Sequence, residues 1–294
     1  MPGESGLKKR LWILLFLGPS LTGLLIFILG PVLYSLGLTL YDWNLLSPPR
    51  YVGLNNFAEV FQDTRFLQAF EHTLTYLVLY VPSVLVLAFG MALLLNQPLR
   101  GRAFFRMAFF IPVVSSWVAV SVIWRWIFNP RFGLMNYLLG LVGIEGPGWL
   151  FDPDWVLYAI VIASVWKDTG FVAVLFLAGL QGIPGIYYEA AKIDGANARQ
   201  RLRHITIPLI TPTTFFALIT SLISSFQMFD QAWLMPERFA RSGASVVMEQ
   251  IVNNAFRYQR MGYAASMSWI LFAVIFVITV VQLRLQRRWV HYDL

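Results

Sequence analysis

The sequence predicts an all-α membrane protein with six transmembrane helices. Two observations on composition support this fold class: 58% of the 294 residues are hydrophobic and only 13% are charged, with a mean hydropathy of +0.64. Soluble proteins carry about 25% charged residues, and a soluble core of this size could not bury so much apolar surface. The lengths of the apolar runs are a third observation, and they indicate helices. All of them belong to a single domain, residues 1–294.

Six apolar runs are each long enough to cross a bilayer, which takes about 20 residues. None of them alternates as a strand of a transmembrane barrel does. We expect breaks at Pro82 in the second helix and at residues 167–170 in the fourth, where protein or a water-filled cavity must cover irregular backbone. The expected helices are residues 12–34, 74–95, 107–128, 156–180, 208–229 and 262–283.

The first run follows the basic residues 8–10, as the apolar part of a signal peptide would. It continues past Leu29, however, and no small-residue cleavage site follows it. We therefore expect a retained first helix.

The charges between the helices predict the orientation. The two termini and the segments around residues 100–106 and 192–203 hold nearly twice as many Lys and Arg as the other helix ends, whereas Asp and Glu show the opposite bias. Because cytoplasmic loops are enriched in Lys and Arg, both termini are expected in the cytoplasm. The net charge of +7 is then a topology signal, and no basic, aromatic-interleaved stretch predicts nucleic-acid binding.

Three outer loops follow from this orientation. The first, residues 41–73, contains a turn that leads into a short amphipathic helix over residues 57–61. The second covers residues 129–155 and the third residues 230–261. Near the end of the third helix, Arg125 is expected to reach toward the interface with its charged end.

The cytoplasmic segment around residues 184–206 predicts a helix-turn-helix. Pro184 suits the first turn of a helix, because its missing N–H is not needed there. Good helix formers follow up to Asp194, and Gly195 suits the left-handed position that ends a helix. Composition alone favours a simpler alternative, a basic loop that only sets the topology.

The order of residues in this segment changes that balance. Glu189-Ala190-Ala191, then Gly195, then Ile205-Thr206-Ile207-Pro208-Leu209 resembles the EAA loop of permease subunits of bacterial ABC importers. Other segments resemble the carbohydrate branch of that family, in particular residues 104–112, 123–130, 165–171, 177–184 and 262–266. One segment departs from it: residues 235–243 stand where the family often has a glycine-rich stretch.

The resemblance implies the type I ABC importer permease fold, in a bacterial or archaeal plasma membrane. It implies that the chain forms half of a sugar translocation pathway and works with a second permease subunit, a heterodimer being favoured. It also implies two cytoplasmic ATPase subunits and an extracytoplasmic sugar-binding protein. The residues implied in ATPase coupling are Glu189, Ala190, Ala191, Asp194 and Gly195. An ion pair of Glu189 with Lys192 on its own helix is the alternative role for that carboxylate.

The chain has no G-x-x-x-x-G-K-[ST] motif, so ATP and Mg²⁺ are expected on partner subunits and the chain is not expected to be an enzyme. It has no cysteine, and its three histidines are far apart in the sequence. No metal site and no cofactor are therefore expected in this chain.

Lys167 and Asp168 are ionisable groups inside an expected helix, which is costly unless they face a cavity or a partner. One interpretation is a polar wall for a hydroxylated solute, with Trp166 as a stacking platform. The other is a helix–helix contact with the partner subunit. The resemblance adds three solute-path candidates, Ser164, Gln227 and Asp230.

Three other functions predict different features of the sequence. A permease of the same fold for a polyol or a glycerol phosphate remains an alternative, but a phosphate ester needs convergent basic groups, and with only Lys167 in place a neutral sugar is favoured. A membrane-embedded enzyme predicts a buried catalytic cluster, which the sequence does not show. A secondary transporter needs an ion-coupling carboxylate, for which Asp168 is the candidate, and leaves the cytoplasmic loop unexplained.

Overall fold

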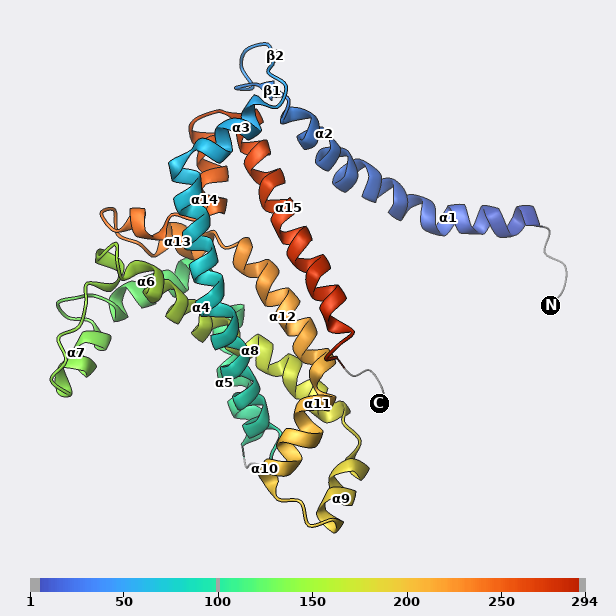
Figure 1. The fold of residues 1–294 in the computed structure, drawn as a ribbon, viewed down its shortest axis with the longest axis vertical. Coiled ribbons are helices and arrows are strands. Elements are labelled where there is room, and N and C mark those ends of the chain that lie inside the picture. The colour runs from blue at the N-terminus through green and yellow to red at the C-terminus, as the bar shows by residue number, and fades with distance from the viewer. Residues whose placement is uncertain (1–5, 99–100, 291–294) are drawn as a thin grey trace. The chain divides into compact units, whose positions relative to one another are not determined.

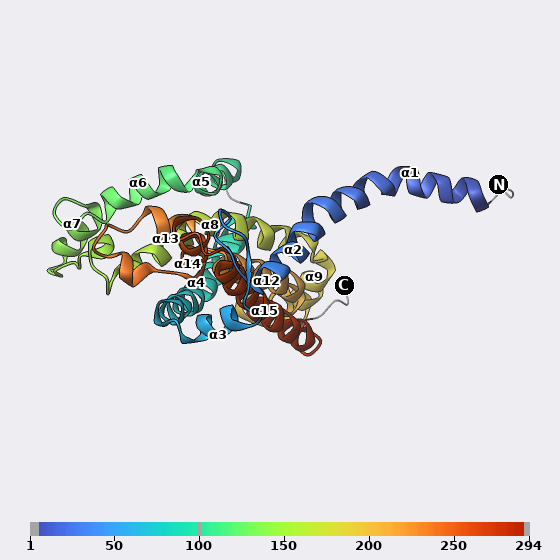
Figure 2. The same cartoon turned by 90° about the horizontal axis from the view of Figure 1, so that it is seen from above.

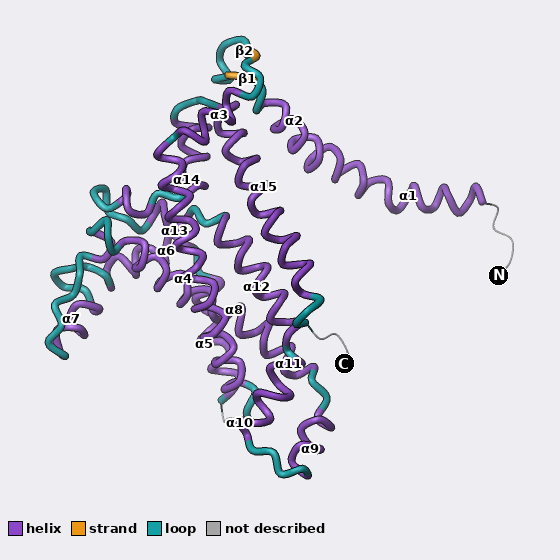
Figure 3. Tube along the Cα trace, viewed as in Figure 1, coloured by secondary structure: helices purple, strands orange, loops and turns teal. Residues whose placement is uncertain are grey.

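A computed structural model describes residues 6–98 and 101–290, and nearly every element in it is helical (Figures 1 and 3). The chain divides into two compact units. Unit 1 comprises Met1–Asp63 and Ile251–Ile270, and unit 2 comprises Thr64–Gln250 and Leu271–Leu294.

Unit 1 begins with a long apolar rod. Its elements are α1 (Gly6–Leu24), the π-helical turn η1 (Leu25–Leu29) and α2 (Gly30–Leu38). The wider π turn ends two residues before Pro31. The ring of a proline clashes with the carbonyl four residues earlier, and proline has no N–H to form the α-helical hydrogen bond, which accounts for the wider turn here. A two-stranded antiparallel ribbon, β1 (Tyr41–Asp42) with β2 (Arg50–Tyr51), and the short helix α3 (Asn55–Gln62) follow. This confirms the expected helix near residues 57–61.

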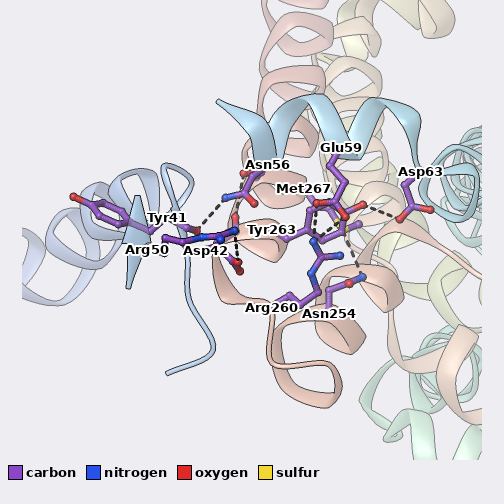
Figure 4. Close-up of polar contacts among 12 residues, drawn as sticks. Tyr41, Asp42, Arg50, Asn56, Glu59, Asp63, Asn254, Arg260, Tyr263 and Met267 are labelled. Atoms are coloured by element: carbon purple, nitrogen blue, oxygen red, sulfur yellow. Dashed lines mark hydrogen bonds and ion pairs between the residues drawn. The ribbon is translucent and has the colours of Figure 1, made fainter. Parts of the chain in front are cut away.

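Side-chain hydrogen bonds tie α3 to its neighbours in unit 1 (Figure 4). The Asn56 amide donates to the carbonyl oxygens of Thr39 at 2.8 Å and Tyr41 at 3.0 Å. Arg260 donates to both carboxylate oxygens of Glu59, at 2.8 and 2.6 Å. These contacts hold α3 against the end of α2 and the turn before α15 (Met261–Gln286).

Unit 2 is built around two long helices, α4 (Thr64–Leu95) and α8 (Val156–Gly182), which pack along each other (Figures 1 and 2). The buried face of α4 repeats every four residues from Tyr76 through Tyr80 and Val84 to Ala92, which is the helical period. Its remaining elements are α5 (Arg102–Val114), α6 (Trp117–Ile127), α7 (Leu134–Leu141), η2 (Trp149–Phe151), α9 (Gly185–Ile193), α10 (Ala198–Arg201), η3 (Leu202–Thr206), α11 (Ile207–Leu209), α12 (Thr211–Phe226), α13 (Asp230–Leu234) and η4 (Arg241–Ala244).

The last two helical elements before α15 are α14 (Val247–Val252) and the π turn η5 (Asn253–Arg257). By length and hydropathy, five helices of the described chain could cross a membrane, and a bent helix pair would make a sixth span. The five are Leu11–Leu38, Thr64–Leu95, Val156–Gly182, Thr211–Leu234 and Met261–Gln286.

The third expected helix, residues 107–128, is not one helix. It divides into α5 and α6, which meet at an angle of 100° (Figure 1). Pro112 removes a helical hydrogen bond near the end of α5, and Ser115 and Ser116 are extended, with ψ of 139° and 149°. The Ser116 hydroxyl then accepts from the Ala119 N–H and starts α6 as its N-cap.

The breaks expected in the second and fourth helices are wrong. α4 continues through Pro82, next to which the Ser83 hydroxyl donates to the Leu79 carbonyl at 2.7 Å. α8 continues through residues 167–170, where the Thr169 hydroxyl donates to the Val165 carbonyl at 2.5 Å. Packing of the two long helices against each other overrides the local preference of single Pro and Gly residues.

Candidate functional site

The segment after α8 folds as the expected helix-turn-helix. α9 ends at Ile193, and two residues later Gly195 has a φ of +76°, the left-handed conformation that glycine adopts without strain. The N–H of Gly195 bonds the Lys192 carbonyl at 3.1 Å, and the N–H of Ala196 bonds the Ala191 carbonyl at 2.8 Å. This pair of bonds is a Schellman motif, which fixes the exit angle of the chain.

α10 starts immediately afterwards with a capping box. The Asn197 side chain accepts from the Gln200 N–H at 2.9 Å, and the Gln200 side chain accepts from the Asn197 N–H at 2.8 Å. The Arg201 guanidinium donates to the Ala196 carbonyl at 2.9 Å, across the turn. The turn between α9 and α10 is thus fixed by hydrogen bonds at every residue from 195 to 197.

The two sides of α9 differ in burial. Ala191 is half-buried, and so is Tyr188, which packs on the core while its hydroxyl lies 3.0 Å from the Thr206 hydroxyl. On the opposite side, one arc of the helix presents exposed residues at i, i+3, i+4 and i+7. We call this arc the α9 outer face; it consists of Ile186, Glu189, Ala190 and Ile193.

The α9 outer face combines apolar side chains with one carboxylate. Ile193 is 87% exposed and Ile186 69% exposed, which is unusual for isoleucine in a well-ordered helix. In the described structure no ion pair joins Glu189 to Lys192. Asp194 follows as the C-cap residue and is exposed. Of the five expected coupling residues, Glu189 and Ala190 belong to the outer face, while Ala191 lies on the opposite side of α9.

A second candidate site is a cavity of about 520 Å³ in unit 2, which we call the polar cavity. Three of the expected solute-path residues line it, namely Asp168, Gln227 and Asp230. Its other lining residues are Tyr76, Tyr80, Val113, Trp117, Phe171, Val172, Thr220, Ser221, Ser224, Met228, Phe229 and Gln231. Aromatic rings beside hydroxyl and amide groups are suited to a solute that has both apolar faces and hydroxyl groups.

Asp168 is held in place by the two tyrosines of α4. The Tyr80 hydroxyl donates to Asp168 Oδ2 at 2.8 Å. The Tyr80 ring stacks on that of Tyr76, with centroids 5.1 Å apart, and Gln231 donates to the Tyr76 hydroxyl at 3.4 Å. Residues from α4, α8 and α13 thereby meet at one wall of the cavity.

Lys167 does not line the polar cavity. Its side chain is buried, and its ammonium donates to the carbonyl oxygens of Pro112 at 3.0 Å and Val113 at 2.9 Å. The ammonium also lies 5.5 Å from the centre of the Trp117 ring. These groups belong to the junction of α5 and α6, so the structure places this lysine at the bend.

The two other expected solute-path residues also lie away from the polar cavity. Trp166 lines a separate, mostly apolar cavity of about 720 Å³, with its ring edge against Trp124 at 5.6 Å. Ser164 is fully buried between helices. Trp166 and Asp168 therefore face different cavities, although they are only two residues apart on α8.

The segment at residues 235–243, which departs from the family pattern, is an ordered part of unit 2. Arg125 forms an ion pair with Glu237, whose N–H also bonds the Leu150 carbonyl at 3.0 Å. Arg241 donates to the Trp233 carbonyl at 3.0 Å and lies 4.8 Å from the centre of its ring. Arg125 does not line the polar cavity, and its charged end meets an acid from a distant loop.

Sequence reasoning missed the contribution of α4 to the polar cavity. Tyr76 and Tyr80 are four residues apart, a spacing that puts both hydroxyls on one helix face. The sequence shows this spacing. However, the apolar residues of the same helix follow it too, so it indicates burial of the two tyrosines in the protein core equally well. Among the described residues, no group of three or more His, Cys, Asp or Glu side chains could hold a metal ion.

Comparisons with known proteins agree with these features. Residues 57–291 match the family "binding-protein-dependent transport system inner membrane component". The chain is 36% identical to the probable ABC transporter permease protein YesP of Bacillus subtilis, over 95% of this chain and 91% of that protein. It is 35% identical to the lactose transport system permease protein LacF of Rhizobium radiobacter, over 91% of each chain.

A solved structure shows the same fold. The crystal structure of a bacterial ABC transporter involved in the import of the acidic polysaccharide alginate contains a chain that matches with a TM-score of 0.83 and 26% identity, over 95% of this chain and 96% of that one. With the family match over most of its length, the chain belongs to the inner membrane components of binding-protein-dependent transport systems, as a permease of the carbohydrate ABC importer type.

Proposed function

We propose that this chain forms one half of the translocation pathway of an ATP-driven saccharide importer. It couples to a cytoplasmic ATPase through the α9 outer face and contacts solute in the polar cavity. The observation that carries the proposal is the α9 outer face itself, which is ordered, exposed and apolar around one carboxylate.

The stability of the loop supports a coupling role. The Schellman motif at Gly195 and the capping box at Asn197 make the α9–α10 turn stiff, and Tyr188 joins α9 to Thr206 at the start of the following helices. A rigid element can transmit a displacement, whereas a flexible loop would absorb it. Conformational work done by an ATPase would therefore pass into the membrane helices.

The remaining partners follow from the kind of transport system. The family depends on a binding protein, so an extracytoplasmic saccharide-binding protein delivers the solute. A second permease subunit supplies the other half of the pathway, two ATPase subunits bind ATP and Mg²⁺, and both chain termini lie in the cytoplasm. The lactose permease relative and the alginate importer both support a saccharide as solute.

The test uses the complete transporter expressed with an affinity tag on this chain. Ile193→Glu places a charge at the most exposed isoleucine of the α9 outer face, and Glu189→Lys combined with Gly195→Pro removes both the carboxylate and the turn. Ala198→Glu is the matched control, because Ala198 is exposed on α10 and lies outside that face. The amount of ATPase that co-purifies is the readout.

We expect the first two variants to lose the ATPase and Ala198→Glu to retain it. Equal recovery of the ATPase from all variants would show that the loop only sets topology, and the proposal would then be wrong.

A further inference from the structure

The charged groups of the polar cavity are all of one sign. Asp168 and Asp230 both line it, and none of its described lining residues is Lys, Arg or His. Asp230 is exposed in the first turn of α13, while Asp168 is half-buried on α8. The two carboxylates come from different helices, so the negative potential extends across the cavity.

The base next to Asp168 in the sequence does not line the cavity. Lys167 is next to Asp168 in α8, but its ammonium is bound to the Pro112 and Val113 carbonyls. These contacts stabilise the ammonium where it is, because α-helical C-terminal carbonyls attract positive charge. Val113 and Trp117, which the ammonium contacts, line the cavity, so Lys167 offsets part of the potential of Asp168 from behind that wall.

The carboxylate of Asp168 has a fixed direction. The Tyr80 hydroxyl donates to one of its oxygens, and the stack of Tyr80 on Tyr76 fixes that hydroxyl. A hydrogen bond to an ionised acceptor is stronger than one between neutral groups. This hydrogen bond holds the Asp168 side chain at the wall of the cavity.

From this arrangement we propose that the polar cavity is a charge filter, which admits neutral and cationic saccharides, such as amino sugars, and slows anionic ones. Asp168 and Asp230 are its specificity-determining residues. The proposal rests on the proposed function, in which this cavity is part of the solute path. The alginate importer shows that the same fold can serve an acidic polysaccharide, so charge preference must come from side chains such as these.

The absence of cysteine in the sequence allows a direct test. Ser224→Cys places a single thiol at an exposed position on the cavity wall, in the complete transporter. Its reaction is timed with three methanethiosulfonate reagents that differ in charge, one cationic, one neutral and one anionic. The mass increase of this chain reports the reaction, and each rate is divided by the rate of the same reagent with a free small thiol.

A negatively lined cleft raises the local concentration of cations by a factor of about 10 to 1,000. We therefore expect the normalised cationic rate to exceed the anionic rate by about tenfold or more. Asp168→Asn and Asp230→Asn, each added to Ser224→Cys, should reduce that ratio several-fold. Asp154→Asn is the matched control, an exposed carboxylate outside the cavity wall, and should leave the ratio unchanged.

A ratio near one for Ser224→Cys, or a ratio unaffected by both cavity variants, would overturn the charge filter. Thr220→Cys is a second reporter on the same wall. If neither thiol reacted with any of the reagents, the cavity would be closed to solutes and the proposal would also be wrong.

A transport measurement separates this proposal from the function on which it rests. Uptake of lactose and of a disaccharide that carries a uronic acid is compared in proteoliposomes, with Asp168→Asn beside the unchanged chain. The filter predicts that Asp168→Asn improves uptake of the anionic sugar relative to the neutral one. A charge-dependent thiol reaction without saccharide uptake would leave the filter standing and reject the saccharide importer.

Discussion

The ammonium of Lys167 lies 3.0 Å from the carbonyl oxygen of Pro112, in the last turn of α5. The same group binds the next carbonyl, that of Val113, at 2.9 Å. α5 ends there, and the chain turns by 100° into α6. A buried base on α8 therefore caps the end of a broken helix, where its ammonium bonds two of the last carbonyl oxygens of α5.

Replacing Lys167 with Met should destabilise the protein. The substitution keeps the length of the side chain but removes the ammonium. The Pro112 carbonyl keeps its bond from the Ser115 N–H, whereas the Val113 carbonyl loses its side-chain donor, at a cost of about 1–3 kcal/mol for a buried acceptor. Thermal unfolding of the detergent-solubilised transporter measures the loss. Lys192→Met, on the exposed loop, is the control and should change stability by less than about 0.5 kcal/mol. Equal effects of the two variants would contradict a capping role.

Gly170 should tolerate no side chain. A Cβ there would collide with the carbonyl oxygen of Phe109, where α8 and α5 approach closely. Gly170→Ala should therefore separate the two helices and lower the unfolding temperature. Gly90→Ala is the matched control, because α4 leaves open space at that position, and it should be neutral or stabilising by about 0.5–1 kcal/mol. A harmless Gly170→Ala would argue against the close approach of α5 to α8.

Gly195→Ala should loosen the end of α9. An L side chain at a φ of +76° costs about 1–2 kcal/mol, so the Schellman bonds should open more often. Hydrogen exchange of the Gly195 and Ala196 amides, measured by mass spectrometry, should become faster in the variant. Gly185→Ala, at the start of α9 with a free environment and an ordinary backbone, should leave exchange unchanged or slower. Unaltered exchange in both would show that the turn does not depend on glycine.

The Arg260–Glu59 pair should contribute modestly to stability. Both side chains are about half exposed, and double-mutant cycles of such pairs give about 0.2–1 kcal/mol. A cycle built from Arg260→Met and Glu59→Gln should return a coupling in that range, smaller at high salt. A coupling well above it, or one insensitive to salt, would mean that the pair is effectively buried.

The hydrogen bond to Glu59 raises the pKa of Arg260 above its ordinary value, against the opposing effect of burial. A raised pKa in the folded state stabilises the protein fully below the unfolded pKa and loses that effect only as the pH rises through the folded value. This arginine should therefore add no pH dependence near neutrality. Urea unfolding of the Arg260→Met variant should show the same slope against pH between 6 and 9 as the unchanged chain.

The α9–α10 loop could be predicted in detail from the sequence because its signals are local. Pro184 suits a helix start, and Gly195 is the residue that a left-handed turn needs. The capping pair Asn197 and Gln200 became evident only in the structure. Tertiary packing is not required to interpret such signals. The burial difference between Ala190 and Ala191 was less accessible, because it depends on what Tyr188 packs against.

The bend between α5 and α6 could not be predicted, although the residues that cause it are visible. Pro112 and Pro82 look alike in the sequence, yet only the helix with Pro112 is broken nearby. The difference is the partner: Lys167 stabilises one helix end from another helix, whereas α4 is supported along its length by α8. Likewise, the sequence made Lys167 and Asp168 joint candidates for the wall of the solute path. Because neighbouring residues on a helix point in different directions, only Asp168 lines the polar cavity.

The contact between Lys167 and the end of α5 links two positions that are 55 residues apart in the chain. Among descendants of this sequence, loss of the lysine at position 167 is expected together with a change in the bend at residues 112–116. The alternative is that another hydrogen-bond donor has first appeared beside the carbonyls of the bend. The two segments are thus expected to vary together over evolutionary time. The neighbouring carboxylate could diverge freely as the transported solute changed.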